Sequence, residues 1–180
     1  NRGGYLLDRL LHGYNAYLTN VNGDDIHEID LKVLNELQCK ANELIRSNNF
    51  TSSLLATAIQ VDTDYYYKFG GAQFNTNLVE TNYNNWLFKA NILSEIIPNR
   101  GDLLLPFLSY AINKNKSNDA LNICKKNIKR LEAFCYLIRA NNILTDSNLD
   151  KNNLQNSIKL INKSIKAGLF DELTYGYWVK

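Results

Sequence analysis

The sequence predicts an all-α protein built from antiparallel helical hairpins. Apolar residues recur every three to four positions through almost the whole chain of 180 residues, which is the period of one face of an α-helix. No alternating apolar pattern of comparable length indicates a strand. Short segments rich in Gly, Pro, Asn and Ser interrupt the helical pattern, so consecutive helices should fold back on one another.

The first two helices are expected at residues 5–20 and 25–46, separated by the turn sequence "NVNGDD". Asp25 and Glu28 have the three-residue spacing of a capping box, which predicts the start of the second helix. The apolar positions are Leu7, Leu11, Tyr14 and Leu18 in the first helix, and Ile29, Val33, Leu37, Ala41, Leu44 and Ile45 in the second. A third helix begins near Leu54 and continues toward three consecutive tyrosines.

The C-terminal half follows the same pattern. A helix over residues 78–97 should end before Pro98, because proline restricts the residue that precedes it. The next helix should start near Gly101 or Asp102, since Pro106 is tolerated only in a first turn. Residues 117–119 are expected to cap a further helix, and a last helix should be closed by Gly168.

Cys124 and Cys135 leave two structures open. A turn between Lys129 and Arg130 would bring the two thiols together across antiparallel helices, where they could form a disulfide in an oxidising compartment. One continuous helix over residues 118–144 fits the apolar stripe equally well and would hold the sulfurs about 16 Å apart. In either structure, reduced and buried thiols are the default expectation.

Helix ends recur at intervals of roughly 30 to 40 residues, which includes the ~34-residue unit of tetratricopeptide repeats. A degenerate array of this type and an irregular helical bundle both explain the period. We expect N-terminal helices over residues 1–71 and a hairpin-repeat region over residues 72–180, in one compact unit. Small residues should let paired helices approach closely. The candidates are Ala90, Ala111, Ala120, Ala133 and Ala140.

Three short sequence elements of the C-terminal half are similar to those of a known protein family. The elements are Ile97-Pro98-Asn99, Asp119-Ala120-Leu121 and Ala167-Gly168-Leu169. Over about residues 80–173 the chain resembles the soluble, tetratricopeptide-like C-terminal region of bacterial membrane glycan polymerases and ligases, the family of O-antigen polymerases and protein O-oligosaccharyltransferases.

The resemblance implies a non-catalytic domain on the periplasmic side of the inner membrane that supports the membrane domain or recruits substrate. Its partners would be that membrane domain and a protein, peptide or glycan. The chain starts at Asn1 and contains no methionine, so we expect it to be a piece of a longer protein. The alternative is a free-standing cytoplasmic adaptor that binds a protein or peptide.

Motifs for chemistry are sparse. His12 and His27 stand apart and the cysteines lack metal-ligand spacing, so neither a metal nor a cofactor is expected. A small glycan-active enzyme would need a carboxylate pair, for which Asp62 and Asp64 are the candidates.

The stretch "DTDYYYKFGGAQF", residues 62–74, is the candidate binding site. Three adjacent tyrosines on a helix fan out over roughly 200 degrees, so at least one should be exposed. We expect Tyr65 and Tyr67 to form an aromatic contact surface, with Asp62 or Asp64 as hydrogen-bond acceptors and Trp86 nearby. Ordinary packing of aromatic side chains between helices is the alternative.

Charge is distributed unevenly in a chain whose formal net charge is +2. Residues 114–139 carry seven basic residues against Asp119 and Glu132. This segment could meet phosphate, lipid headgroups or acidic glycans, or it could be a solvated helix face. Nucleic acid is not an expected partner, because the chain as a whole is nearly balanced in charge.

Overall fold

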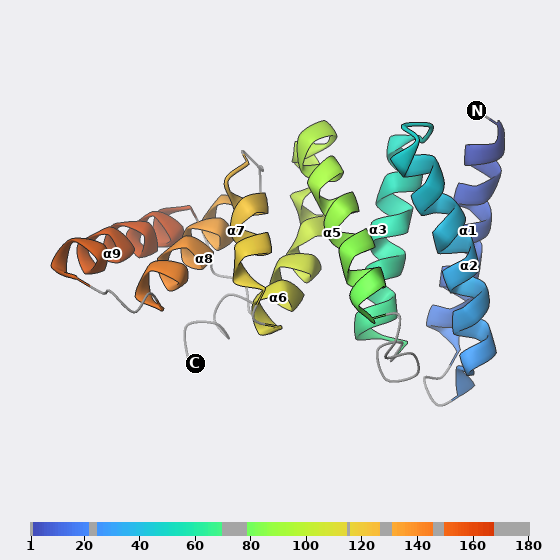
Figure 1. The fold of residues 1–180 in the computed structure, drawn as a ribbon, viewed down its shortest axis with the longest axis horizontal. Helices are drawn as coiled ribbons and strands as arrows, with labels where there is room; N and C mark the ends of the chain where they lie inside the picture. The colour runs from blue at the N-terminus through green and yellow to red at the C-terminus, as the bar shows by residue number, and fades with distance from the viewer. Residues whose placement is uncertain are drawn as a thin grey trace. The chain divides into compact units, whose positions relative to one another are not determined.

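The computed structural model describes residues 2–21, 25–69, 79–114, 116–126, 131–145 and 150–167, and these residues contain helices and no strand. Figure 1 shows the helices as separate segments that follow one another in chain order. The predicted all-α class is confirmed. The described part of the chain contains no helix that combines the length and the apolar character needed to cross a membrane.

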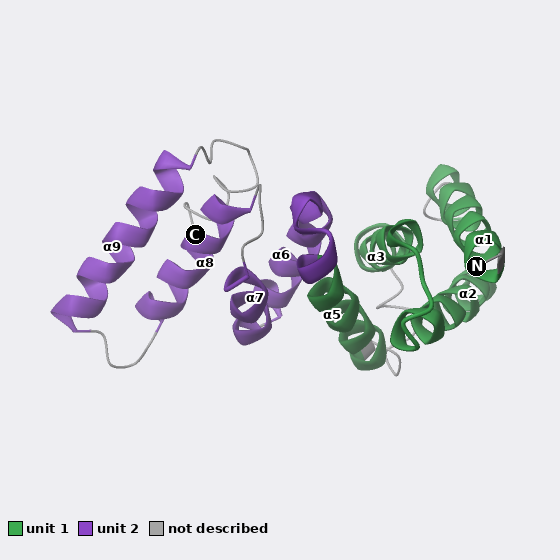
Figure 2. Ribbon diagram, turned by 90° about the horizontal axis from the view of Figure 1, so that it is seen from above, with its two compact units in different colours: residues 1–93 green, residues 94–180 purple. Residues whose placement is uncertain are grey.

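Contacts divide the chain into two compact units, residues 1–93 and 94–180 (Figure 2). The boundary lies after Leu93, within a helix, rather than after residue 71, and there are two units rather than the single one expected. Gly70 and Gly71, on which the earlier boundary was based, lie outside the described residues.

Unit 1 contains α1 (Arg2–Asn20), α2 (Glu28–Arg46), α3 (Ser52–Tyr67) and most of α5 (Val79–Ile96). α1, α2 and α3 pack against one another in all three pairings. Its largest fully buried apolar side chains come from all four helices: Leu11, Leu18, Leu34, Ile45, Leu54, Leu55, Ile59, Tyr83, Trp86 and Leu93.

Unit 2 contains the 3₁₀ segment η3 (Pro98–Leu104) and helices α6 (Leu105–Asn113), α7 (Ser117–Cys124), α8 (Glu132–Leu144) and α9 (Lys151–Lys166). Each packs against its neighbour in sequence, and the most extensive pairing joins α8 to α9, which lie side by side in Figure 2. The five alanines predicted at close helix contacts, of which Ala90 lies in unit 1, are all buried.

Helix starts differ from the expectation in three places, and the first is α1, which begins at Arg2 rather than residue 5. α2 begins at Glu28 rather than residue 25, and Asp30 replaces the predicted pair, because its carboxylate accepts a 3.1 Å hydrogen bond from the His27 backbone N–H. α6 begins at Leu105 rather than near Gly101, since residues 98–104 form the 3₁₀ segment. Pro106 does lie in the first turn of α6, and α5 ends before Pro98 as predicted.

Cys124 and Cys135 are joined in a disulfide, with Cα atoms 5.0 Å apart. The default expectation of reduced thiols is therefore wrong. Cys124 is the last residue of α7, and Cys135 lies in the first turn of α8. α7 and α8 are separate helices, so the alternative of one continuous helix over residues 118–144 is wrong. The predicted turn between Lys129 and Arg130 lies outside the described residues. Gly168, expected to close the last helix, lies outside the described residues.

Candidate functional site

The two aspartates of the candidate binding stretch are buried in unit 1. Asp62 is 5% exposed and Asp64 is 2% exposed. They lie two positions apart on α3, about 200 degrees around the helix, so their side chains reach different neighbours. Asp62 accepts a 2.7 Å hydrogen bond from Gln38 Nε2, whereas Asp64 accepts one of 2.8 Å from Asn15 Nδ2. They are not a matched pair of carboxylates around one ligand.

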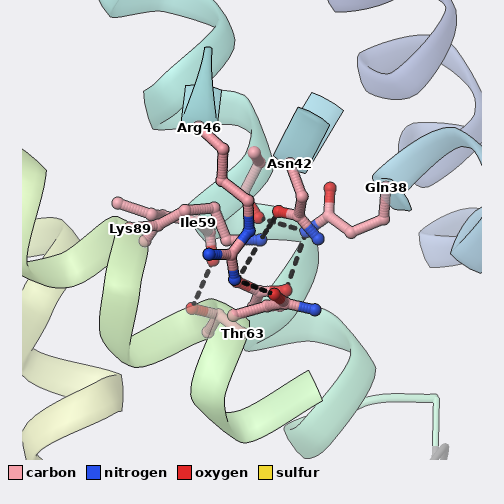
Figure 3. A network of polar contacts seen from close by, with 9 residues as sticks. Gln38, Asn42, Arg46, Ile59, Thr63 and Lys89 are labelled. Carbon is pink, nitrogen blue, oxygen red and sulfur yellow. Dashed lines mark hydrogen bonds and ion pairs between the residues drawn. The ribbon is translucent and has the colours of Figure 1, made fainter. Parts of the chain in front are cut away.

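Lys89 on α5 completes the environment of Asp62. Its side chain is fully buried, and its Nζ lies 2.8 Å from Asp62 Oδ2 and 2.8 Å from Asn42 Oδ1. Gln38 donates to the carbonyl of Ala58 at 2.6 Å as well as to Asp62. Figure 3 shows this polar cluster, in which Gln38 and Asn42 of α2 and Lys89 of α5 converge on α3. We call Gln38, Asn42, Asp62 and Lys89 the buried polar cluster.

Burial opposes ionisation of both charged members of this cluster. It raises the pKa of Asp62 and lowers the pKa of Lys89, and in each case the opposite charge of the partner works against the shift. The hydrogen bond that Gln38 donates to Asp62 and the one that Asn42 accepts from Lys89 replace contacts that bulk water would otherwise provide. The cluster therefore acts as a structural connection among α2, α3 and α5.

Two further buried carboxylates connect α1 to α3. Asp8 of α1 accepts a 2.6 Å hydrogen bond from Ser53 Oγ. Asp64 accepts the hydrogen bond from Asn15 of α1. Its Oδ1 also lies 2.8 Å from Lys68 Nζ, four residues further along the chain. The contacts of Asp8 with Ser53 and of Asp64 with Asn15 hold α1 and α3 together, and they explain why polar side chains occur on the inner faces of these helices.

The tyrosines divide between the interior and the surface. Tyr65 is 3% exposed, whereas Tyr67 is 51% exposed. Tyr66 is half-buried and stacks on buried Trp86, with ring centroids 5.2 Å apart and planes within 10°. Tyr65 meets Tyr66 edge to face at 5.3 Å. Burial also raises the pKa of the Tyr65 hydroxyl.

The expected aromatic contact surface is therefore wrong for most of its members. Asp62, Asp64, Tyr65 and Trp86 are buried in unit 1, and only Tyr67 is exposed. The alternative of aromatic packing between helices describes Tyr65, Tyr66 and Trp86. The prediction that at least one tyrosine is exposed is confirmed by Tyr67. The glycan-active enzyme is also contradicted, because neither carboxylate is accessible to a sugar.

Sequence reasoning missed Lys89, although a signal was present. Trp86, Lys89 and Leu93 have the spacing of one helix face, so a charged residue stands in an apolar stripe. Gln38 and Asn42 stand in the same way among Leu34, Ala41 and Ile45 of α2. A lysine that interrupts one apolar stripe and amides that interrupt another indicate a buried polar contact.

In unit 2, a pair of small residues on each helix brings α8 and α9 close together. Ser164 Oγ donates to the carbonyl of Ala133 at 2.9 Å, and Ser157 Oγ donates to that of Ala140 at 3.4 Å. Both pairs are seven residues apart, which is two turns of helix. The serines are buried, so α9 turns a largely small and polar face toward α8.

Beside this seam is an open hollow of about 570 Å³, which we call the α8–α9 hollow. Its lining contains four cationic side chains and no acidic one. The residues are Arg139, Ile143, Asn156, Lys159, Leu160, Asn162, Lys163 and Lys166. A smaller hollow of about 200 Å³ shares Arg139 and adds Lys125, Lys126, Glu132, Tyr136 and the disulfide.

Among the described residues, no three His, Cys, Asp or Glu side chains lie close enough together to bind a metal ion. Both histidines are exposed: His12 lies in α1, and His27 is the N-cap residue of α2.

Comparisons with known proteins give no relative. No protein-family model, no curated protein and no solved structure matches the chain.

Proposed function

We propose that this chain is a non-catalytic, extracytoplasmic helical domain of a membrane-bound glycan polymerase or O-oligosaccharyltransferase, where it supports the membrane domain or recruits substrate. The observation that carries the proposal is the disulfide between Cys124 and Cys135. Disulfides persist in oxidising compartments such as the bacterial periplasm and are rare in the cytosol. The disulfide therefore favours the periplasmic domain over the cytoplasmic adaptor.

The contacts of the buried polar side chains in unit 1 also support a structural, non-catalytic role for the domain. Asp62, Asp64 and Lys89, which could have served chemistry, are engaged in contacts between helices. The resemblance on which this proposal rests spans residues 80–173 and would include all of the described helices of unit 2. The reaction would then belong to other parts of the parent protein.

Cys39 provides a direct test, because it is exposed and is not part of the disulfide. In intact spheroplasts expressing the full-length protein, a membrane-impermeant maleimide should label Cys39 before lysis. Cys124 and Cys135 should react only after reduction. A Cys39→Ser variant, which should give no labelling before reduction, is the matched control.

The opposite pattern would overturn the proposal. If labelling requires lysis and all three cysteines then react without reductant, the protein is cytoplasmic. The hypothesis of a cytoplasmic adaptor would then replace that of a periplasmic domain. The complete gene gives a second test, since a glycan polymerase should encode several apolar segments of about 20 residues outside this region.

A further inference from the structure

The α8–α9 hollow has the character of a binding site for an anion. Its volume of about 570 Å³ falls in the range of roughly 300–1,000 Å³ that ligand pockets occupy. Arg139 contributes from α8 and three lysines contribute from α9, with no carboxylate in the lining. The described part of α9, residues 151–166, contains no Asp or Glu at all.

This arrangement of lysines is costly for an isolated helix. Lys159 and Lys163 are four residues apart and Lys163 and Lys166 are three apart, so like charges are neighbours on one face. A solvated helix normally mixes charges of both signs at these spacings. Lys163 also lies over the ring of Tyr136, with Nζ 5.8 Å from the centroid, which directs its stem toward α8.

The charges are spread along the helix rather than gathered at one point. Lys159 and Lys166 are seven residues apart, which corresponds to about 10.5 Å along the axis. A single phosphate could contact only part of such a row. An extended anion with several charges can contact all of it.

The rest of the lining indicates a peptide rather than a bare polyanion. Ile143 and Leu160 are half-buried and offer an apolar surface between the cations. Asn156 and Asn162 add amide groups that can both donate to and accept from a peptide backbone. Charge complementarity and this apolar patch together favour a short acidic segment with an apolar side chain between its carboxylates.

We propose that the α8–α9 hollow binds an acidic peptide segment of a partner protein, with carboxylates along Lys159, Lys163 and Lys166 and at Arg139, and an apolar side chain against Ile143 and Leu160. The site lies wholly within unit 2. It does not depend on the compartment of the protein or on the glycan polymerase assignment.

The test is fluorescence anisotropy with the full chain and a dye-labelled acidic peptide of about twelve residues, which spans about 18 Å as a helix. The peptide carries glutamates at helical spacing with leucines between them. Its control has glutamine at every glutamate position. The acidic peptide should bind, and binding should be lost between 0.1 M and 1 M salt, where the screening length falls from about 10 Å to about 3 Å.

A double variant, Lys159→Gln with Lys163→Gln, should weaken binding about tenfold, since each exposed charge pair contributes a factor of about three. The matched control is Lys32→Gln with Lys40→Gln, which removes the same charge from two exposed positions of α2. The control should bind as the unchanged protein does.

Thermal stability separates binding from a structural role. Removing two neighbouring like charges should leave the melting temperature of the Lys159→Gln/Lys163→Gln variant unchanged or slightly raised. Loss of binding together with a lower melting temperature would mean that these lysines hold the hairpin together, and it would contradict the proposal.

Two other outcomes would also overturn the proposal. Equal binding of the glutamine peptide would show that charge is not recognised. Displacement of the acidic peptide by inorganic polyphosphate of equal charge at a lower concentration would show that the hollow takes a phosphate polyanion instead.

Discussion

Both units are all-helical, but the helices inside each unit are held together by different interactions. Unit 1 contains the charged residues that are buried in the described part of the chain, Asp8, Asp62, Asp64 and Lys89. Unit 2 buries small and apolar side chains, joins α7 to α8 by a disulfide and keeps its cations at the surface. Helical hairpins can therefore be fixed either by buried polar contacts or by a covalent link. The first makes stability sensitive to loss of a buried charge, and the second makes it sensitive to reduction.

The largest expected effect is in unit 1. Lys89→Met removes the buried cation and leaves the Asp62 carboxylate without its ion-pair partner. We expect the free energy of unfolding of unit 1 to fall by about 3–5 kcal/mol, the usual consequence of breaking a buried ion pair. Urea unfolding followed by the fluorescence of Trp86 measures this loss, in a Trp178→Phe background that makes Trp86 the sole tryptophan.

The double variant Asp62→Leu with Lys89→Met is the control for this prediction. Replacing both charges with apolar residues of similar size is often neutral or stabilising, so the double variant should recover most of the loss. If it is as unstable as the single variant, the lysine acts through packing and the pairing argument is wrong.

Next in size is the effect of the disulfide in unit 2. Cys124→Ser with Cys135→Ser opens a loop whose ends are 11 residues apart. A loop of this length should cost about 3 kcal/mol in the unfolding free energy of unit 2, measured by urea unfolding followed by circular dichroism. Reducing agent should have the same effect on the unchanged protein and none on the double variant.

Cys39→Ser supplies the matched control, because Cys39 is exposed in unit 1. It should change stability by less than about 0.5 kcal/mol. The Trp86 signal of unit 1 should also be insensitive to reducing agent. A loss of unit 1 stability on reduction would end the proposed contrast between the two units.

The smallest effect is the pH dependence of the Lys89→Met variant. Without Lys89, burial acts on Asp62 with less opposition, so the pKa of Asp62 is raised further above 3.8 in the folded state. The folded state then binds this proton more tightly than the unfolded state does. The free energy of unfolding should therefore increase as pH falls from the folded pKa to 3.8, by at most about 1.4 kcal/mol per pH unit.

This pH dependence is read as a difference between two variants, since other carboxylates titrate in the same range. The Asp62→Leu/Lys89→Met variant lacks the group and should not show the extra stabilisation at low pH. Parallel stability curves for the two variants would mean that Asp62 does not carry a raised pKa.

The helices themselves were largely predictable because they depend on local sequence. Apolar spacing placed α1, α2, α3 and α5 within a few residues, and Pro98 marked the end of α5. Helix starts were less predictable. In the cap of α2, His27 takes the N-cap position predicted for Asp25, and Asp30 takes the position three residues further on that was predicted for Glu28.

The candidate site was harder to predict because burial depends on distant segments. Tyr65 and Tyr67 are two residues apart on one helix, yet one is buried and the other exposed. What decides between them is the position of other helices, including the one that carries Trp86. The same applies to Asp62, whose ion-pair partner lies 27 residues further along the chain.

Local spacing and turn chemistry were enough to predict that the chain is helical, where most helices lie and that a turn could pair Cys124 with Cys135. The tertiary structure was needed to show that Cys124 is bonded to Cys135, that Lys89 meets Asp62 and that four cations line one hollow. These outcomes depend on which helix faces pack together. That choice is made by contacts between residues far apart in sequence, which periodicity alone does not encode.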